Sequence, residues 1–223
     1  MPPRFWVLRP AKSRPAGVDP EKIVVRHIKC PVNPAHNGTR GLKSGLSIVL
    51  PSKHVGDFVW TWFSQVLIGD RARAFLREHR FTGYRLKQAG ARFRKAEYGL
   101  PPPLRELKVT GWAGMAAPES GVELVDACKV CGMLEYRISD CSRLISPRRW
   151  DGADIFMVWP MPLFIFLSDR AGTLLRSAKF TGISVLPAEE IRLDLRGTFS
   201  PGRLSNHMPH SRAKILGAKL GIV

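Results

Sequence analysis

The stretch Val59–Leu86, VWTWFSQVLIGDRARAFLREHRFTGYRL, recurs as Val158–Val185, VWPMPLFIFLSDRAGTLLRSAKFTGISV. The two stretches align without a gap at an offset of 99 (158 − 59 = 99), with ten identities in 28 positions. The identities include Asp70-Arg71-Ala72 and Phe81-Thr82-Gly83, each repeated in the second stretch. Because the period is longer than the repeats of about 20 to 50 residues that build solenoids, the pattern predicts duplication of a small α+β unit.

Each copy of this unit is predicted to form a strand, a helix and a second strand. In the second copy Leu163–Leu167 is a short apolar strand, and Ser168 and Asp169 stand at the N-cap and in the first turn of a helix. The helix has one apolar stripe at positions i, i+3, i+4 and i+7: Ala171, Leu174, Leu175 and Ala178. Thr181-Gly182 ends the helix, and Ile183–Leu186 resumes as a strand.

The first copy follows the same plan. Its helix begins at Gly69-Asp70, ends at Thr82-Gly83 and leads into the strand Tyr84-Arg85-Leu86. The paired Asp-Arg motifs, Asp70-Arg71 and Asp169-Arg170, are interpreted as helix starts and solvated helix face rather than as catalytic groups.

The duplication predicts an α+β fold with a mainly antiparallel sheet in two related halves, residues 1–100 and 101–195. Pro101-Pro102-Pro103 marks the turn between them, and a strand is predicted directly after it. Residues 196–223 carry five basic residues and no acidic one, with many small or polar side chains. We expect a mobile basic tail there, with a nucleic-acid-binding arm as the sharper alternative.

The charge balance is the unusual feature of the composition. The net charge is +17, from 35 Lys and Arg against 18 Asp and Glu, which favours an acidic partner such as nucleic acid, an anionic membrane or an acidic protein. The apolar run at the N-terminus, Phe5–Leu8, is too short for a secretory signal, and the run Ile155–Leu167 is too short to span a bilayer. We therefore expect a soluble, cytoplasmic protein, whose cysteines serve as thiols or metal ligands.

One cysteine pair has the spacing of a metal-binding turn. In Cys128-Lys129-Val130-Cys131-Gly132, the two thiolates can coordinate one tetrahedral metal ion, and the glycine lets the backbone turn beneath the sulfurs. A redox dithiol at a helix start is the other interpretation, but a loop of small residues precedes this pair. Two further ligands are needed to complete a structural zinc site.

The repeat indicates where those ligands lie. Subtracting the offset from Cys128 leads to residue 29, next to Cys30, and His36 is the nearest second ligand in a turn of suitable length. A Cys3His zinc site made of Cys30, His36, Cys128 and Cys131 would join the two halves and, having no open position for substrate, would be structural. Cys141 and His27 remain substitutes for the fourth ligand; otherwise Cys141 is a lone thiol. The alternative without a metal is a set of ordinary buried thiols and a surface histidine.

These motifs resemble the myxobacterial paralogous family that is named for a double CXXCG motif. The resemblance covers most of residues 4–195 and is carried by Arg4-Phe5-Trp6, the Cys30–His36 turn, Cys128–Gly132 and the segment Asp154–Glu190. One motif departs from the family pattern, since the first half has Cys-x5-His in place of CxxCG. Members are immunity proteins against toxins delivered by contact between kin, so the resemblance implies a non-catalytic protein that binds and neutralises a cognate toxin.

The sequence offers little support for an enzyme. It has no Gly-rich phosphate loop, GxSxG or HExxH motif, and the adjacent Glu189-Glu190 would point to opposite faces of a strand. A zinc-ribbon nucleic-acid-binding protein is the serious alternative, because it would explain the charge and the basic helix around Arg71–Arg80. The equivalent helix of the second half is less basic, which favours a solvated face over a nucleic-acid surface.

Overall fold

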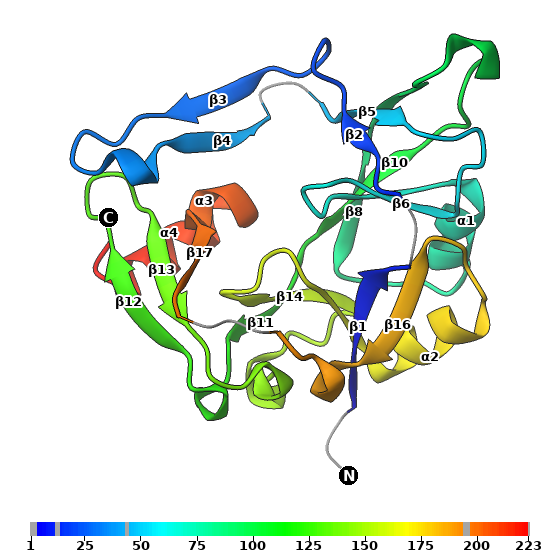
Figure 1. Cartoon of the computed structure of the whole chain (residues 1–223). Coiled ribbons are helices and arrows are strands. Elements are labelled where there is room, and N and C mark those ends of the chain that lie inside the picture. Colours follow the sequence, from blue (N-terminus) through cyan, green and yellow to red (C-terminus); the bar gives the residue numbers. More distant parts are fainter. Residues whose placement is uncertain (1–3, 12–13, 43–44, 194–196, 223) are drawn as a thin grey trace.

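The fold is mixed α+β and consists mostly of short sheets, as a computed structural model of residues 4–11, 14–42, 45–193 and 197–222 shows (Figure 1). The strands are β1 (Phe5–Pro10), β2 (Gly17–Val18), β3 (Val25–Ile28), β4 (Gly38–Leu42), β5 (Ser47–Leu50), β6 (Phe58–Trp60), β7 (Val66–Ile68), β8 (Tyr84–Gln88), β9 (Gly90–Phe93), β10 (Arg105–Val109), β11 (Gly111–Met115), β12 (Glu123–Ala127), β13 (Leu134–Arg137), β14 (Ile155–Trp159), β15 (Ile165–Ser168), β16 (Ile183–Pro187) and β17 (Phe199–Gly202). The α-helices are α1 (Asp70–Glu78), α2 (Asp169–Ser177), α3 (Leu204–His207) and α4 (His210–Lys219). Short 3-10 helices are η1 (Pro34–His36), η2 (Ala96–Tyr98), η3 (Pro118–Ser120), η4 (Cys141–Arg143), η5 (Pro147–Arg149) and η6 (Ala188–Glu190).

Two sheets share the central core. One has the strand order β6-β7-β10-β8 and the other β11-β14-β15-β1-β16. Ala72 and Leu76 of α1 lie in the same apolar cluster as Ala171 and Leu175 of α2, together with residues of both sheets. The two helices therefore cover one continuous core.

Each half supplies a strand to the sheet of the other half. Strand β1 lies between β15 and β16, where Leu8 pairs with Ile165 and Val185, and β10 lies between β7 and β8, where Leu107 pairs with Val66 and Leu86. The two sets of paired residues correspond at the offset of the repeat: 99 positions separate Leu107 from Leu8 (107 − 8), Ile165 from Val66 (165 − 66) and Val185 from Leu86 (185 − 86). The exchange ties the two halves into one folding unit.

A buried carboxylate joins the halves on one side. Asp154 accepts hydrogen bonds from the backbone N–H and hydroxyl of Thr82, at 3.0 and 3.2 Å, and from the Ser168 hydroxyl at 2.9 Å. The Arg170 guanidinium donates to the same carboxylate and, at 2.9 Å, to the backbone oxygen of His79. Burial raises the pKa of Asp154, but the hydrogen bonds from Arg170, Thr82 and Ser168 outweigh it and hold that pKa below its usual value.

The same arrangement occurs on the other side. Asp57 accepts from the backbone N–H and hydroxyl of Thr181, at 2.9 and 2.8 Å, and Arg71 donates to Asp57 and to the backbone oxygen of Ala178. Arg71 and Arg170, interpreted from the sequence as solvated helix face, thus bridge the halves. That interpretation is incomplete, because both arginines cross between the halves and the Asp169 carboxylate also accepts a hydrogen bond from Trp6 Nε1 at 3.0 Å.

The substitution Asp154→Asn should destabilise the fold by about 2–3 kcal/mol at neutral pH, because it weakens charge-assisted bonds that cross between the halves. The folded-state pKa lies below the unfolded one, so this stabilisation is present above pH of about 4 and is lost as the pH falls through the folded pKa. Urea unfolding measures the free energy of unfolding of both proteins. The difference between variant and wild type should be smaller near pH 3 than at neutral pH. Asp70→Asn is the matched control, since the exposed Asp70 forms an ion pair with Arg73 alone among the described residues, and its replacement should cost less than about 0.5 kcal/mol.

The helix starts agree with the sequence analysis, and two other elements differ from it. The Ser168 side chain accepts from the backbone N–H of Ala171 and caps α2. The helices end at Glu78 and Ser177, before the predicted Thr-Gly ends, and a short turn follows each. Glu189 and Glu190 are exposed in the 3-10 helix η6 and not on a strand, because β16 ends at Pro187.

The C-terminal segment, for which the sequence predicts a mobile tail, forms β17, α3 and α4. Strand β17 pairs with β13, and Leu204, Met208 and Leu216 pack into an apolar cluster with Tyr136 and Trp159. Sequence periodicity missed this because α3 is a single turn and α4 buries few large side chains. Residues 194–196, where that predicted tail begins, lie outside the described residues.

A long hairpin, β3–β4, extends across the molecule towards the C-terminal elements (Figure 1). From His27 to Gly38, none of its side chains belongs to the four apolar clusters of the protein. This part of the hairpin is therefore not anchored in the apolar core. Within the described part of the chain, no helix has the length and apolar character needed to cross a bilayer.

Candidate metal centre

Four side chains that the sequence analysis singled out come together at the hairpin tip. The sulfurs of Cys30, Cys128 and Cys131 and a ring nitrogen of His36 all lie within 4.8 Å of one another. Cys30 and Cys128 approach to 3.9 Å between sulfurs, and His36 Nδ1 lies 3.7 Å from the Cys131 sulfur. A tetrahedral site with metal–sulfur bonds of about 2.3 Å needs ligand separations of about 3.8 Å. The donors fit one tetrahedral metal ion with little rearrangement.

The turn between β12 and β13 supplies two of these donors. Its backbone is closed by the N–H of Gly132 donating to Cys128 O at 2.7 Å and the N–H of Cys128 donating to Met133 O at 2.9 Å. Gly132 has φ +69°, a conformation that other residues rarely adopt. The predicted role of the glycine, turning the chain beneath the sulfurs, matches this geometry.

The hairpin tip supplies the other two donors. The Asn33 backbone N–H lies 3.4 Å from the Cys30 sulfur, and the Asn37 side chain accepts from the Cys30 N–H at 2.7 Å. The Asn33 amide holds His36 Nε2 at 3.2 Å, so Nδ1 is the ring atom that faces the sulfurs. The longer Cys-x5-His spacing is accommodated by η1, which brings His36 back beside Cys30.

The surrounding groups favour thiolates at two of the cysteines. Hydrogen bonding from the Asn33 backbone lowers the pKa of Cys30. The backbone N–H of Cys131 and the ring of His36 lower the pKa of Cys128. Burial raises the pKa of Cys131, which therefore favours the protonated thiol in the absence of a cation.

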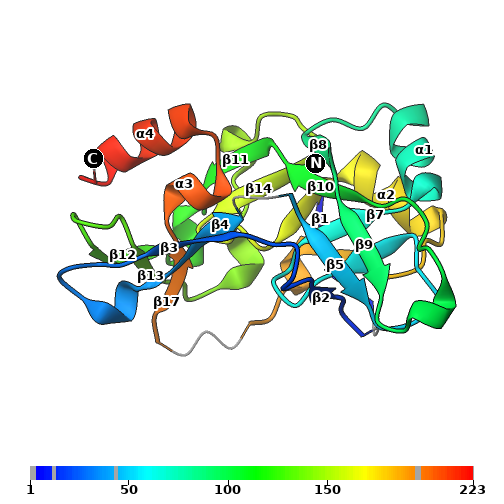
Figure 2. The same cartoon turned by 90° about the horizontal axis from the view of Figure 1, so that it is seen from above.

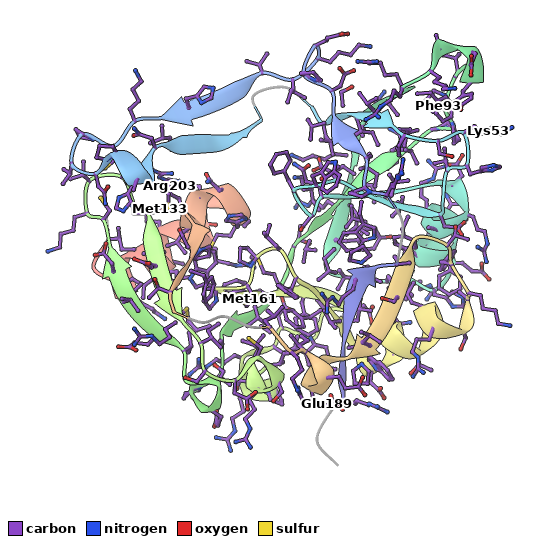
Figure 3. All side chains as sticks on the ribbon, viewed as in Figure 1. Lys53, Phe93, Met133, Met161, Glu189 and Arg203 are labelled. Atoms are coloured by element: carbon purple, nitrogen blue, oxygen red, sulfur yellow. The ribbon has the colours of Figure 1, made fainter. Side chains whose placement is uncertain are left out.

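Arg203 connects the turn that carries Cys131 to the turn that carries His36. The sequence did not identify this residue. This buried guanidinium donates to Cys131 O at 2.6 Å and to His36 O at 2.9 Å, one carbonyl from each turn. Figure 3 shows Arg203 between the hairpin tip and the turn that carries Met133. Three thiolates and a divalent cation would leave one negative charge, which the arginine offsets. No local motif marks Arg203, because its partners lie 72 and 167 positions away.

The two substitute ligands lie elsewhere. Cys141 is buried in η4 within another apolar cluster, where burial raises its pKa. His27 is exposed on β3. Among the described His, Cys, Asp and Glu side chains, the ligand cluster contains only Cys30, His36, Cys128 and Cys131.

Comparison with protein-family models finds no match for this sequence, and comparison with curated proteins finds no similar one.

Proposed function

We propose that Cys30, His36, Cys128 and Cys131 bind one structural zinc ion. The observation that carries this proposal is the donor set: three cysteines and one histidine, the combination used by structural zinc sites, with no Asp or Glu of the described residues in the cluster. Four such ligands would fill a tetrahedral site. The ion would connect a hairpin of the first half to the second half. We further propose that the halves arose by duplication, which the shared register offset of β1 and β10 supports.

The protein's role, on this proposal, is non-catalytic: it binds and neutralises a cognate toxin in the cytoplasm. The resemblance to the double-CXXCG family supports this role, with the Cys-x5-His turn standing in for one CxxCG. The charge of +17 suits a toxin with an acidic surface.

Co-expression tests the role directly. The gene beside this one should be lethal when expressed alone and tolerated when this protein is present. Co-purification of the two proteins as a stable complex would show neutralisation by binding. Survival that needs no complex, or a harmless neighbouring gene, would contradict the proposal.

A zinc-ribbon protein that binds nucleic acid is the second candidate, and the net charge favours it. The basic helix α1 gives it less support than the sequence suggests, because Arg71 and Arg73 are engaged by Asp57 and Asp70. A salt titration separates the candidates. Tight duplex binding at physiological salt would contradict toxin neutralisation, whereas weak binding that falls steeply with salt is incidental phosphate contact.

Replacing Arg203 with methionine should weaken zinc affinity about tenfold, the usual effect of losing a group that orients the ligands. The substitution removes both hydrogen bonds and leaves the four ligands unchanged. Competition with a chromophoric chelator measures the affinity. Arg137→Met is the control, because Arg137 forms an exposed ion pair with Glu123 on the same half. Equal affinities for the two variants would show that Arg203 has no role in positioning the ligands.

A further inference from the structure

A groove beside the C-terminal helix is lined by both apolar and cationic side chains. It has a volume of about 690 Å³ and lies between α4 and β11, with η5 at one end. Figure 2 shows α4 on the side of the molecule where β11 lies. The groove is separate from the Cys/His cluster, whose residues do not line it.

Three of the lining side chains are aliphatic. They are Met115, Ile215 and Leu216, and Ile215 is 62% exposed although it is a large apolar side chain. Leu216 belongs to the cluster that anchors α4, so the aliphatic lining is continuous with the core. An exposed isoleucine on a fixed helix gives a partner apolar surface to cover.

Three other lining side chains are cationic. They are Arg149, Arg212 and Lys219, and the described lining of the groove contains no Asp or Glu. These three cations also form no ion pair with the carboxylates of the described residues. Arg149 is held across β11 by hydrogen bonds to Met115 O and Ala116 O, at 3.3 and 3.4 Å. Its charge is fixed in place and not neutralised.

The aromatic group in the groove is already covered. The Arg212 guanidinium lies over the Trp112 ring at 4.9 Å, and the indole packs against the apolar cluster beneath it. A nucleobase therefore has no free aromatic face on which to stack, and stacking is what binds single strands without sequence preference. The aliphatic and cationic lining residues instead fit a peptide that presents both carboxylates and leucine-like side chains.

We propose that this groove binds an acidic amphipathic segment of a partner protein. This inference rests on the proposed function, because it takes the occupant of the groove to be a protein. It adds the surface to which that protein binds. Lys219 and Ile215 are the residues whose replacement tests it, because both are exposed in the groove and neither holds the fold together.

The binding test uses a fluorescein-labelled peptide of repeated Glu-Leu-Leu-Glu units, its Lys-for-Glu counterpart and a labelled oligothymidylate. The acidic peptide should bind best, and Lys219→Glu and Ile215→Ser should each raise its Kd about tenfold. Lys214→Glu is the matched control: the same charge change on the same helix, outside the groove, should leave the Kd within about twofold. Thermal unfolding of each variant verifies that the fold is intact.

Other outcomes would overturn the proposal. Failure of the acidic peptide to bind is one of them, and an equal loss of peptide affinity in Lys214→Glu and Lys219→Glu is another. Tighter binding of the oligonucleotide than of the peptide, weakened by Lys219→Glu, would assign the groove to nucleic acid. Co-expression separates this proposal from the proposed function. If wild type and Lys219→Glu protect equally, the groove is not the toxin surface while neutralisation stands; if wild type gives no protection, neutralisation fails and the peptide assay still decides the groove.

Discussion

Replacing Cys128 with serine should cost the protein its zinc and release the β3–β4 hairpin from the second half. The hairpin has no side chain between His27 and Gly38 in an apolar cluster, so the metal ligands and Arg203 hold its tip. A ligand present at a thousandfold excess over its Kd stabilises the folded state by about 4 kcal/mol. Losing that in a chain of this size should lower Tm by about 10 °C.

The measurements are zinc content, Tm and amide hydrogen exchange. Wild type should hold one zinc per chain, and Cys128→Ser none. Exchange should accelerate in the hairpin and near β17, and change little in α1 and α2, which have their own core. A local loss of protection would show that the metal fixes the hairpin and not the whole fold.

Cys141→Ala provides the control for this experiment. Cys141 is also a buried thiol, but it lies in η4 outside the ligand cluster. Its replacement should cost about 1 kcal/mol through lost packing and leave the zinc content unchanged. A folded, metal-free wild-type protein with the same Tm as Cys128→Ser would refute the zinc site.

The sequence predicted local structure best. Ser168 and Asp70 mark helix starts because capping depends on a few neighbouring residues, and the ligand turns follow from spacing within a few positions. The exchange of β1 and β10 has no such signal. Leu8 pairs with Val185 across most of the chain, and only the fold decides which apolar strands meet.

The carboxylates that join the halves were missed for a simpler reason. Asp57 and Asp154 occupy equivalent places in the two networks but differ by 97 positions (154 − 57), not 99. An ungapped alignment cannot pair them. An alignment that allows a gap of two residues just before the repeated stretch would pair them. Arg203 lies outside the repeat, so no such alignment could identify it.

Replacing Gly83 with alanine should destabilise the fold by about 4 kcal/mol or more. A Cβ on Gly83 would lie 2.0 Å from the backbone oxygen of Ile155, and φ is +82°. Strand β14 would have to move away, weakening the hydrogen bond that the Ile155 N–H donates to Thr82 O at 3.1 Å. Overpacking costs about 1–3 kcal/mol and the positive φ about 1 kcal/mol, before any lost hydrogen bonds are counted.

Gly152→Ala isolates the effect of close packing from that of the backbone angle. Gly152 has φ +83°, but a Cβ there would meet nothing within 4 Å, so its replacement should cost about 1 kcal/mol. Gly182→Ala should match Gly83→Ala, because its Cβ would lie 2.0 Å from the backbone oxygen of Phe58 on the opposite side of the same interface. Urea unfolding of the three variants measures these costs. If Gly83→Ala were as mild as Gly152→Ala, the backbones of Gly83 and Ile155 could not be packed as closely as the structure has them.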